Sequence, residues 1–120
     1  MSSTYDLIDA SSNKELISLS GSTFIALFDM VDNFDGELPT IDFVEEFEYH
    51  DHSERIPNPV FFNAITIAEN AGNLIRYFNS QSLEDEIGSM AIRHWIDLLR
   101  WVKHYAEENP VSTYSSRLFA

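Results

Sequence analysis

The segment that most constrains the fold is a long amphipathic stretch near the C-terminus. Apolar side chains recur there every three or four positions, which is the spacing of one face of an α-helix. The face consists of Ile87, Ala91, Trp95, Leu98, Val102 and Tyr105. Ile92, Ile96 and Leu99 widen it, as expected of a helix that is packed on two sides. The sequence therefore predicts a long central helix over residues 83–107.

Two further helices are predicted before this one. Asn58 followed by Pro59 is typical of a helix start, and an apolar stripe then continues to about residue 79. The members of that stripe are Phe61, Ile65, Ala68, Ala71, Ile75 and Phe78. A similar spacing of Phe24, Leu27, Phe28 and Val31 predicts a shorter helix. The expected helices thus cover residues 23–34, 59–79 and 83–107.

The N-terminal residues predict a β-hairpin. Apolar residues from Tyr5 to Ile8 and from Leu16 to Leu19 flank a polar turn at residues 10–13. A hairpin packed with three helices gives α+β as the predicted fold class, and an all-α fold is the alternative if these segments are not strands. Residues 38–56 suit a third short strand, a helix or a loop, and the tail 110–120 has no assigned structure. We expect residues 1–120 to form one compact domain.

The charge of the chain is large and unevenly distributed. Twenty acidic residues against seven basic ones give a formal net charge of −13. Residues 1–55 hold 13 of the acids and two bases, and ten of these acids lie between Asp29 and Glu54. Such a field repels nucleic acid and anionic membranes, and it attracts cationic partners. We therefore expect no direct binding to nucleic acid or to membranes.

The predicted binding surface is the acidic segment at residues 29–54. Its carboxylates would steer a basic protein towards it, and an exposed aromatic ring would add contact energy. The candidate residues are Asp29, Asp32, Asp35, Glu37, Asp42, Glu45, Glu46, Phe47, Glu48, Asp51 and Glu54.

These observations predict a small acidic, non-enzymatic protein that neutralises a basic protein partner. It would act as an inhibitor, an immunity protein or a mimic of nucleic-acid charge, and the partner would be a nucleic-acid-binding protein or a nuclease-like toxin. The chain resembles proteins of that kind in charge and size only, and this likeness implies no residue roles. A third possibility is that the acidic surface serves only to keep the protein, as a subunit of an assembly, soluble.

The alternative function is a small metal-dependent enzyme or a metal-binding protein centred on His50 and His52. On an extended segment the two rings of a His-x-His pair point to one face, and imidazole is a common metal ligand. No second spaced ligand cluster accompanies the pair, and the sequence has neither a phosphate-binding glycine loop nor a serine elbow. The sequence therefore predicts no metal, no cofactor and no catalytic residue.

The cellular compartment is predicted from three absences in the sequence. The chain has no cysteine, so neither disulfide bonds nor thiolate ligands are available. No apolar run approaches the ~20 residues of a membrane span. The first residues lack the basic and apolar regions of a signal peptide. We expect a soluble cytoplasmic protein.

Overall fold

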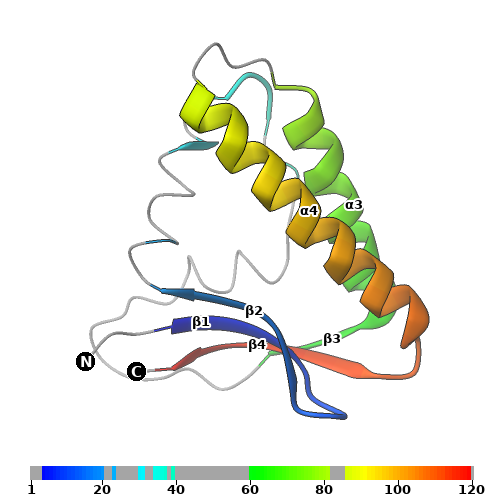
Figure 1. The fold of residues 1–120 in the computed structure, drawn as a ribbon. Helices are drawn as coiled ribbons and strands as arrows, with labels where there is room; N and C mark the ends of the chain where they lie inside the picture. The colour runs from blue at the N-terminus through cyan, green and yellow to red at the C-terminus, as the bar shows by residue number, and fades with distance from the viewer. Residues whose placement is uncertain are drawn as a thin grey trace.

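The computed structural model describes residues 4–20, 23, 30, 31, 34–37, 39, 60–81 and 86–119. Along the chain these residues form β1 (Thr4–Asp9), β2 (Lys14–Ser20), β3 (Val60–Asn63), α3 (Ala64–Asn79), α4 (Glu86–Glu108) and β4 (Thr113–Phe119). The four strands make one sheet, and the two helices lie side by side on one face of it (Figure 1). The predicted α+β class is confirmed.

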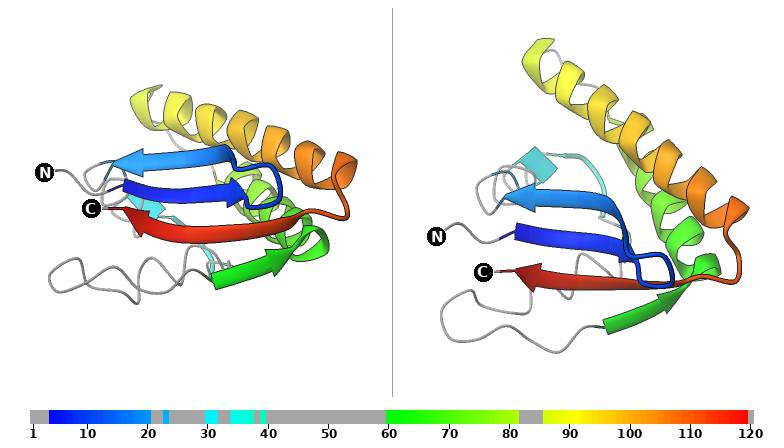
Figure 2. Two further views of the ribbon diagram at one scale, coloured as in Figure 1. Left: turned by 90° about the horizontal axis from the view of Figure 1, so that it is seen from below. Right: turned by 60° about the horizontal axis from the view of Figure 1, so that its bottom comes forward.

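The sheet is larger than the predicted hairpin. Its strand order is β2-β1-β4-β3, and every neighbouring pair is antiparallel (Figure 2). Leu7 of β1 lies opposite Ile17 of β2 on one side and Ser116 of β4 on the other. The C-terminal tail, which had no assigned structure, is therefore an inner strand. Its polar residues Ser115 and Ser116 interrupt the apolar alternation by which a strand is recognised.

The turn between β1 and β2 is fixed at both ends. Asp9 pairs with Lys14, so residues 10–13 make the connection. Asn13 has a φ of 61°, a left-handed conformation that asparagine tolerates better than most residues. The backbone N–H of Ala10 donates to the carbonyl of Thr113 at 2.8 Å, which ties the turn to the start of β4.

Helix α3 begins later than the sequence predicts. Residues 60–63 are a strand, and Asn63 is the N-cap, because its side chain accepts a hydrogen bond from the backbone N–H of Thr66 at 2.8 Å. The buried face of the helix is also offset from the predicted stripe, since Phe61 and Ile65 are 60% and 69% exposed. The apolar residues that are buried on α3 are Ala64, Ile67, Ala71, Leu74, Tyr77 and Phe78.

Helix α4 lies close to its predicted range, and its buried side is centred on the residues that were predicted to widen the stripe. The residues in the core are Ile92, Ile96, Leu99, Val102 and Ala106. Ile87, predicted to begin the buried stripe, is 78% exposed, and Leu98 is half-buried. Trp95, Leu98 and Tyr105 are partly buried against the same core, so the predicted stripe is confirmed except at Ile87, and its centre is shifted towards Leu99. Neither described helix is long and apolar enough to cross a membrane.

Several predicted elements fall wholly or partly outside the described residues. Thr23, Met30 and Val31 are helical, but the remainder of the predicted helix 23–34 is not described apart from Phe34, which lies in a bend. Residues 40–59 lie outside as well, so the strand, helix or loop expected at 38–56 is untested. The described residues contain two long helices where three helices were predicted.

The core lies between the sheet and the helix layer. The sheet contributes Leu7, Leu16, Ile17 and Tyr114, and the helices contribute their buried faces. Phe34 belongs to the same cluster although it precedes α3 by thirty residues. Asp35 and Glu37, which follow Phe34, are exposed on the surface beside this cluster.

Candidate functional site: an acidic turn at the end of α3

Asp35 and Glu37 are the members of the predicted binding surface that the structure describes. Both are exposed, and both follow Phe34, which is buried. The ring of Phe34 lies 5.9 Å from that of Tyr77 and 5.8 Å from that of Phe78, the second contact being edge-on. Aromatic pairs in such tilted arrangements are favourable. Phe34 therefore anchors residues 34–37, which we call the acidic turn, to the last turn of α3.

Gln81 holds the backbone of the acidic turn from the other side. Its Oε1 accepts from the N–H of Asp35, and its Nε2 donates to the carbonyl of Asp35, each at 2.8 Å. Gly36 has a φ of 87°, a conformation that glycine adopts without strain. The backbone is thus fixed at Asp35, while the carboxylates of Asp35 and Glu37 remain exposed.

The electrostatic setting of the turn is negative. It lies beside the C-terminal end of α3, which carries the negative end of the helix dipole, and the carbonyls of the last turn accept hydrogen bonds from Ser80 and Gln81. Burial and the nearby charge of Asp35 raise the pKa of Tyr77. Arg76, the basic residue of the last turn, donates to Asn73. An exposed lysine or arginine of another protein would find favourable charge here.

Most of the predicted surface lies outside the described residues. This applies to Asp29, Asp32, Asp42, Glu45, Glu46, Phe47, Glu48, Asp51 and Glu54, and also to His50 and His52. Among the residues that the structure does describe, no group of three or more His, Cys, Asp or Glu could hold a metal ion. Sequence reasoning missed Gln81, because 46 positions separate it from Asp35 and no local pattern links them.

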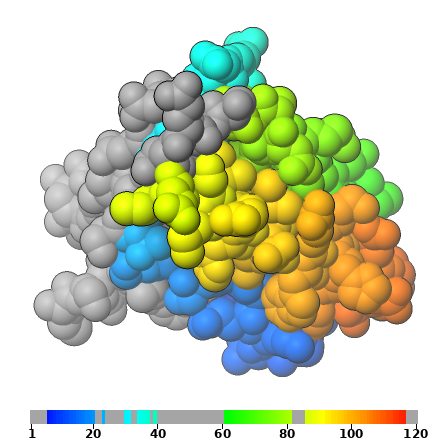
Figure 3. All heavy atoms as spheres, turned by 45° about the horizontal axis from the view of Figure 1, so that its top comes forward, coloured from blue at the N-terminus to red at the C-terminus, as the bar shows by residue number. Residues whose placement is uncertain are grey.

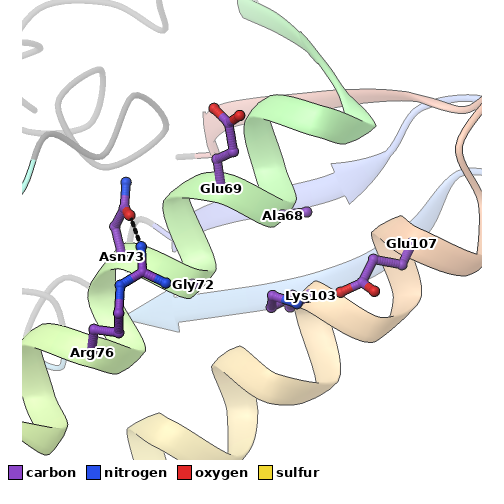
Figure 4. Close-up of a pocket in the computed structure, with 7 residues that line it drawn as sticks. All are labelled: Ala68, Glu69, Gly72, Asn73, Arg76, Lys103 and Glu107. Atoms are coloured by element: carbon purple, nitrogen blue, oxygen red, sulfur yellow. Dashed lines mark hydrogen bonds and ion pairs between the residues drawn. The ribbon is translucent and has the colours of Figure 1, made fainter.

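A shallow groove between α3 and α4 is a second candidate site. Its volume is about 450 Å³, and its lining residues are Ala68, Glu69, Gly72, Asn73, Arg76, Lys103 and Glu107 (Figure 4). Lys103 Nζ lies 2.5 Å from Glu107 Oε1, and this hydrogen bond lowers the pKa of Glu107. Arg76 is bonded to Asn73. Lys103 is therefore paired with a carboxylate, whereas Arg76 keeps its charge and further donors. We prefer the acidic turn as the candidate because it bears exposed carboxylates that the sequence predicts for the binding surface.

Asp9 is an acidic residue of a different kind. It is buried and accepts hydrogen bonds from Tyr105 Oη at 2.7 Å, Ser112 Oγ at 3.0 Å and the N–H of Ser11 at 3.0 Å. These bonds join the β1–β2 turn to α4 and to the start of β4. Asp9 therefore stabilises the fold and is not part of a docking surface.

No family model, curated protein or solved structure matches this chain.

Proposed function

We propose that this chain is a small non-enzymatic binding protein that neutralises a basic protein partner through its acidic segment at 29–54. The observation that carries the proposal is the acidic turn. Its two carboxylates are exposed, while Phe34 and Gln81 fix the backbone that bears them. Charges held in place before binding lose less conformational entropy when a partner docks.

The sign and size of the charge indicate the class of partner. A net charge of −13 accelerates the approach of cationic proteins and repels nucleic acid. Nucleic-acid-binding proteins and nuclease-like toxins carry basic surfaces that bind phosphates. A row of carboxylates offers those surfaces charge of the same sign as phosphate. The proposed roles are therefore those of an inhibitor, an immunity protein or a mimic of nucleic-acid charge.

Capture from a host lysate tests this function. The immobilised protein should retain a basic protein at low salt and release it as the salt concentration rises. The site variant carries Asp35→Asn and Glu37→Gln. The control carries Glu15→Gln and Glu108→Gln, two exposed acids on β2 and α4, so both variants have the same net charge. We expect the control to retain more of the partner than the site variant.

The possible results of the capture distinguish an error in the docking site from an error in the proposed function. Equal retention by the two variants would show that the acidic turn is not the docking point. A retained protein that is acidic, or that resists elution by salt, would contradict the proposed function. An empty capture together with stoichiometric metal in elemental analysis would instead favour the metal protein centred on His50 and His52.

A further inference from the structure

Three exposed apolar side chains lie on one face of α4. Ile87 is 78% exposed, Met90 57% and Trp101 41%. His94, Leu98 and Tyr105 share this face of the helix, because the six residues follow one another at steps of three or four, and we call the six the stripe. Within the stripe His94 is polar and exposed, whereas Leu98 and Tyr105 are half-buried and pack against the core. In Figure 3, α4 (yellow to orange) crosses the visible face of the molecule. Extended apolar surfaces of this kind mark interaction sites on folded proteins.

The C-terminal end of this stripe is held in place by neighbouring contacts. The rings of Trp101 and Tyr105 lie 5.7 Å apart. Lys14 Nζ, from the start of β2, sits 5.6 Å from the Trp101 ring and 5.2 Å from the Tyr105 ring. Cations over aromatic faces at this distance are attracted to them. The aromatic end of the stripe is therefore ordered before any partner binds.

The pattern of charges beside the stripe is complementary to the same pattern in an antiparallel second copy. Glu86, Arg93, Asp97 and His104 lie along one flank of α4, where Asp97 also lies 3.9 Å from Arg100 of its own helix. Arg93 and Asp97 are symmetric about position 95, as are Glu86 and His104. In an antiparallel second copy, Arg93 would face Asp97 of that copy, and Glu86 would face His104. Met90 and Trp101 are symmetric about nearly the same point, so the apolar residues meet in the same register.

We propose that α4 is the interface of an antiparallel homodimer, with a second copy of this chain covering the stripe. The 23 residues of α4 extend over about 35 Å, which gives room for several layers of contact. In a parallel pair this flank would face the opposite flank of the second copy, so the charge pairs described above form only in the antiparallel arrangement. The inference does not depend on the proposed function, because it uses a different surface.

Sedimentation equilibrium from low micromolar to near-millimolar concentration tests the dimer. Ile87→Gln with Met90→Gln removes apolar surface without changing the charge, and it should raise the dissociation constant at least about tenfold. The matched control is Ile65→Gln with Val111→Gln, whose side chains are 69% and 95% exposed on other parts of the fold. It should leave the constant unchanged. A monomer over the whole range, or equal effects of both pairs, would overturn the proposal.

Salt separates this association from docking to a basic protein. Two copies that each carry −13 repel one another, so added salt should tighten the dimer. Binding to a basic partner should weaken under the same conditions. A dimer that weakens steadily with salt would contradict an apolar interface between like-charged copies.

Introduced cysteines test the orientation, because the chain has none of its own. In the antiparallel register centred on position 95, the two copies of residue 94 lie about 3 Å apart along the helix axis, and those of residue 87 about 24 Å apart. His94→Cys should therefore form a disulfide-linked dimer under mild oxidation, and Ile87→Cys should not. Arg93→Asp should weaken the dimer, and adding Asp97→Arg should restore it. Cross-linking at residue 87 would exclude this arrangement.

Discussion

At the scale of single residues, Asp9 shows how a buried charge is accommodated in this fold. Its side chain is 1% exposed and receives hydrogen bonds from Tyr105, Ser112 and the backbone of Ser11. Burial alone would raise the pKa of Asp9, but these hydrogen bonds lower it, and the net effect is a lowered pKa. Burial and the charge of Asp9 also raise the pKa of Tyr114 to about 12. The fold therefore stabilises the ionised form of Asp9 over the protonated form.

A lowered pKa makes a definite prediction for the pH dependence of stability. The stabilisation from Asp9 is fully present above its unfolded pKa of about 3.8, and it is lost as the pH falls through the lower folded value. Asp9→Asn should reduce the free energy of unfolding by about 1–3 kcal/mol at neutral pH. Urea unfolding of both proteins from neutral to strongly acidic pH measures the difference. A difference that stays constant across that range would mean that the charge of Asp9 contributes nothing.

At the scale of elements, α4 shows that packing against the sheet and α3 determines which residues of an apolar stripe are most deeply buried. Leu98 belongs to the stripe that the spacing predicts as buried, yet it is half-buried, while Leu99 is 1% exposed. Leu99→Ala should cost about 2–5 kcal/mol, the range for emptying a packed leucine site. Leu98→Ala, the matched control, should cost less. Denaturant melts measure both, and a larger loss for Leu98→Ala would show that the buried face is misplaced.

A glycine in the middle of α3 gives a second prediction at this scale. A Cβ atom at Gly72 would lie 3.5 Å from Lys103 Cε and 3.7 Å from Arg76 Nη1, which are ordinary contacts with flexible side chains. Glycine inside a helix is about 1 kcal/mol less favourable than alanine. Gly72→Ala should therefore raise the unfolding free energy by roughly 0.5–1 kcal/mol, and Ala68→Gly should lower it. A loss of stability in Gly72→Ala would show that the packing of α3 against α4 requires a residue without a Cβ atom at position 72.

The elements also show which parts of the fold the sequence predicts. Residues 64–79 and 86–108 repeat their apolar spacing locally, so both helices were expected. β4 was missed because its pairing with β1 joins residues more than a hundred positions apart. The start of α3 was misplaced because Phe61 continues the helical spacing although it lies in β3. Of the candidate site, charge indicated Asp35 and Glu37, and nothing local indicated Gln81.

At the scale of the whole molecule, repulsion among the negative charges opposes the stability of the compact fold. A net charge of −13 on 120 residues destabilises the compact state by self-repulsion. The core between the sheet and the two helices offsets that cost, and the acidic turn is fixed to this core through Phe34. The proposed role in binding would account for the carboxylates gathered at 29–54, and association kinetics can measure that role.

Stopped-flow association with the basic partner recovered by salt elution, at several salt concentrations, tests this claim most directly. We expect Asp35→Asn with Glu37→Gln to slow association at low salt by roughly up to tenfold and to flatten its salt dependence. Glu45→Gln, Glu46→Gln and Glu48→Gln together should act in the same direction. Melting temperatures should be kept or raised, and the control with Glu15→Gln and Glu108→Gln should associate faster than either variant. If both acidic-segment variants associate at the wild-type rate at every salt concentration, the segment is not a docking surface.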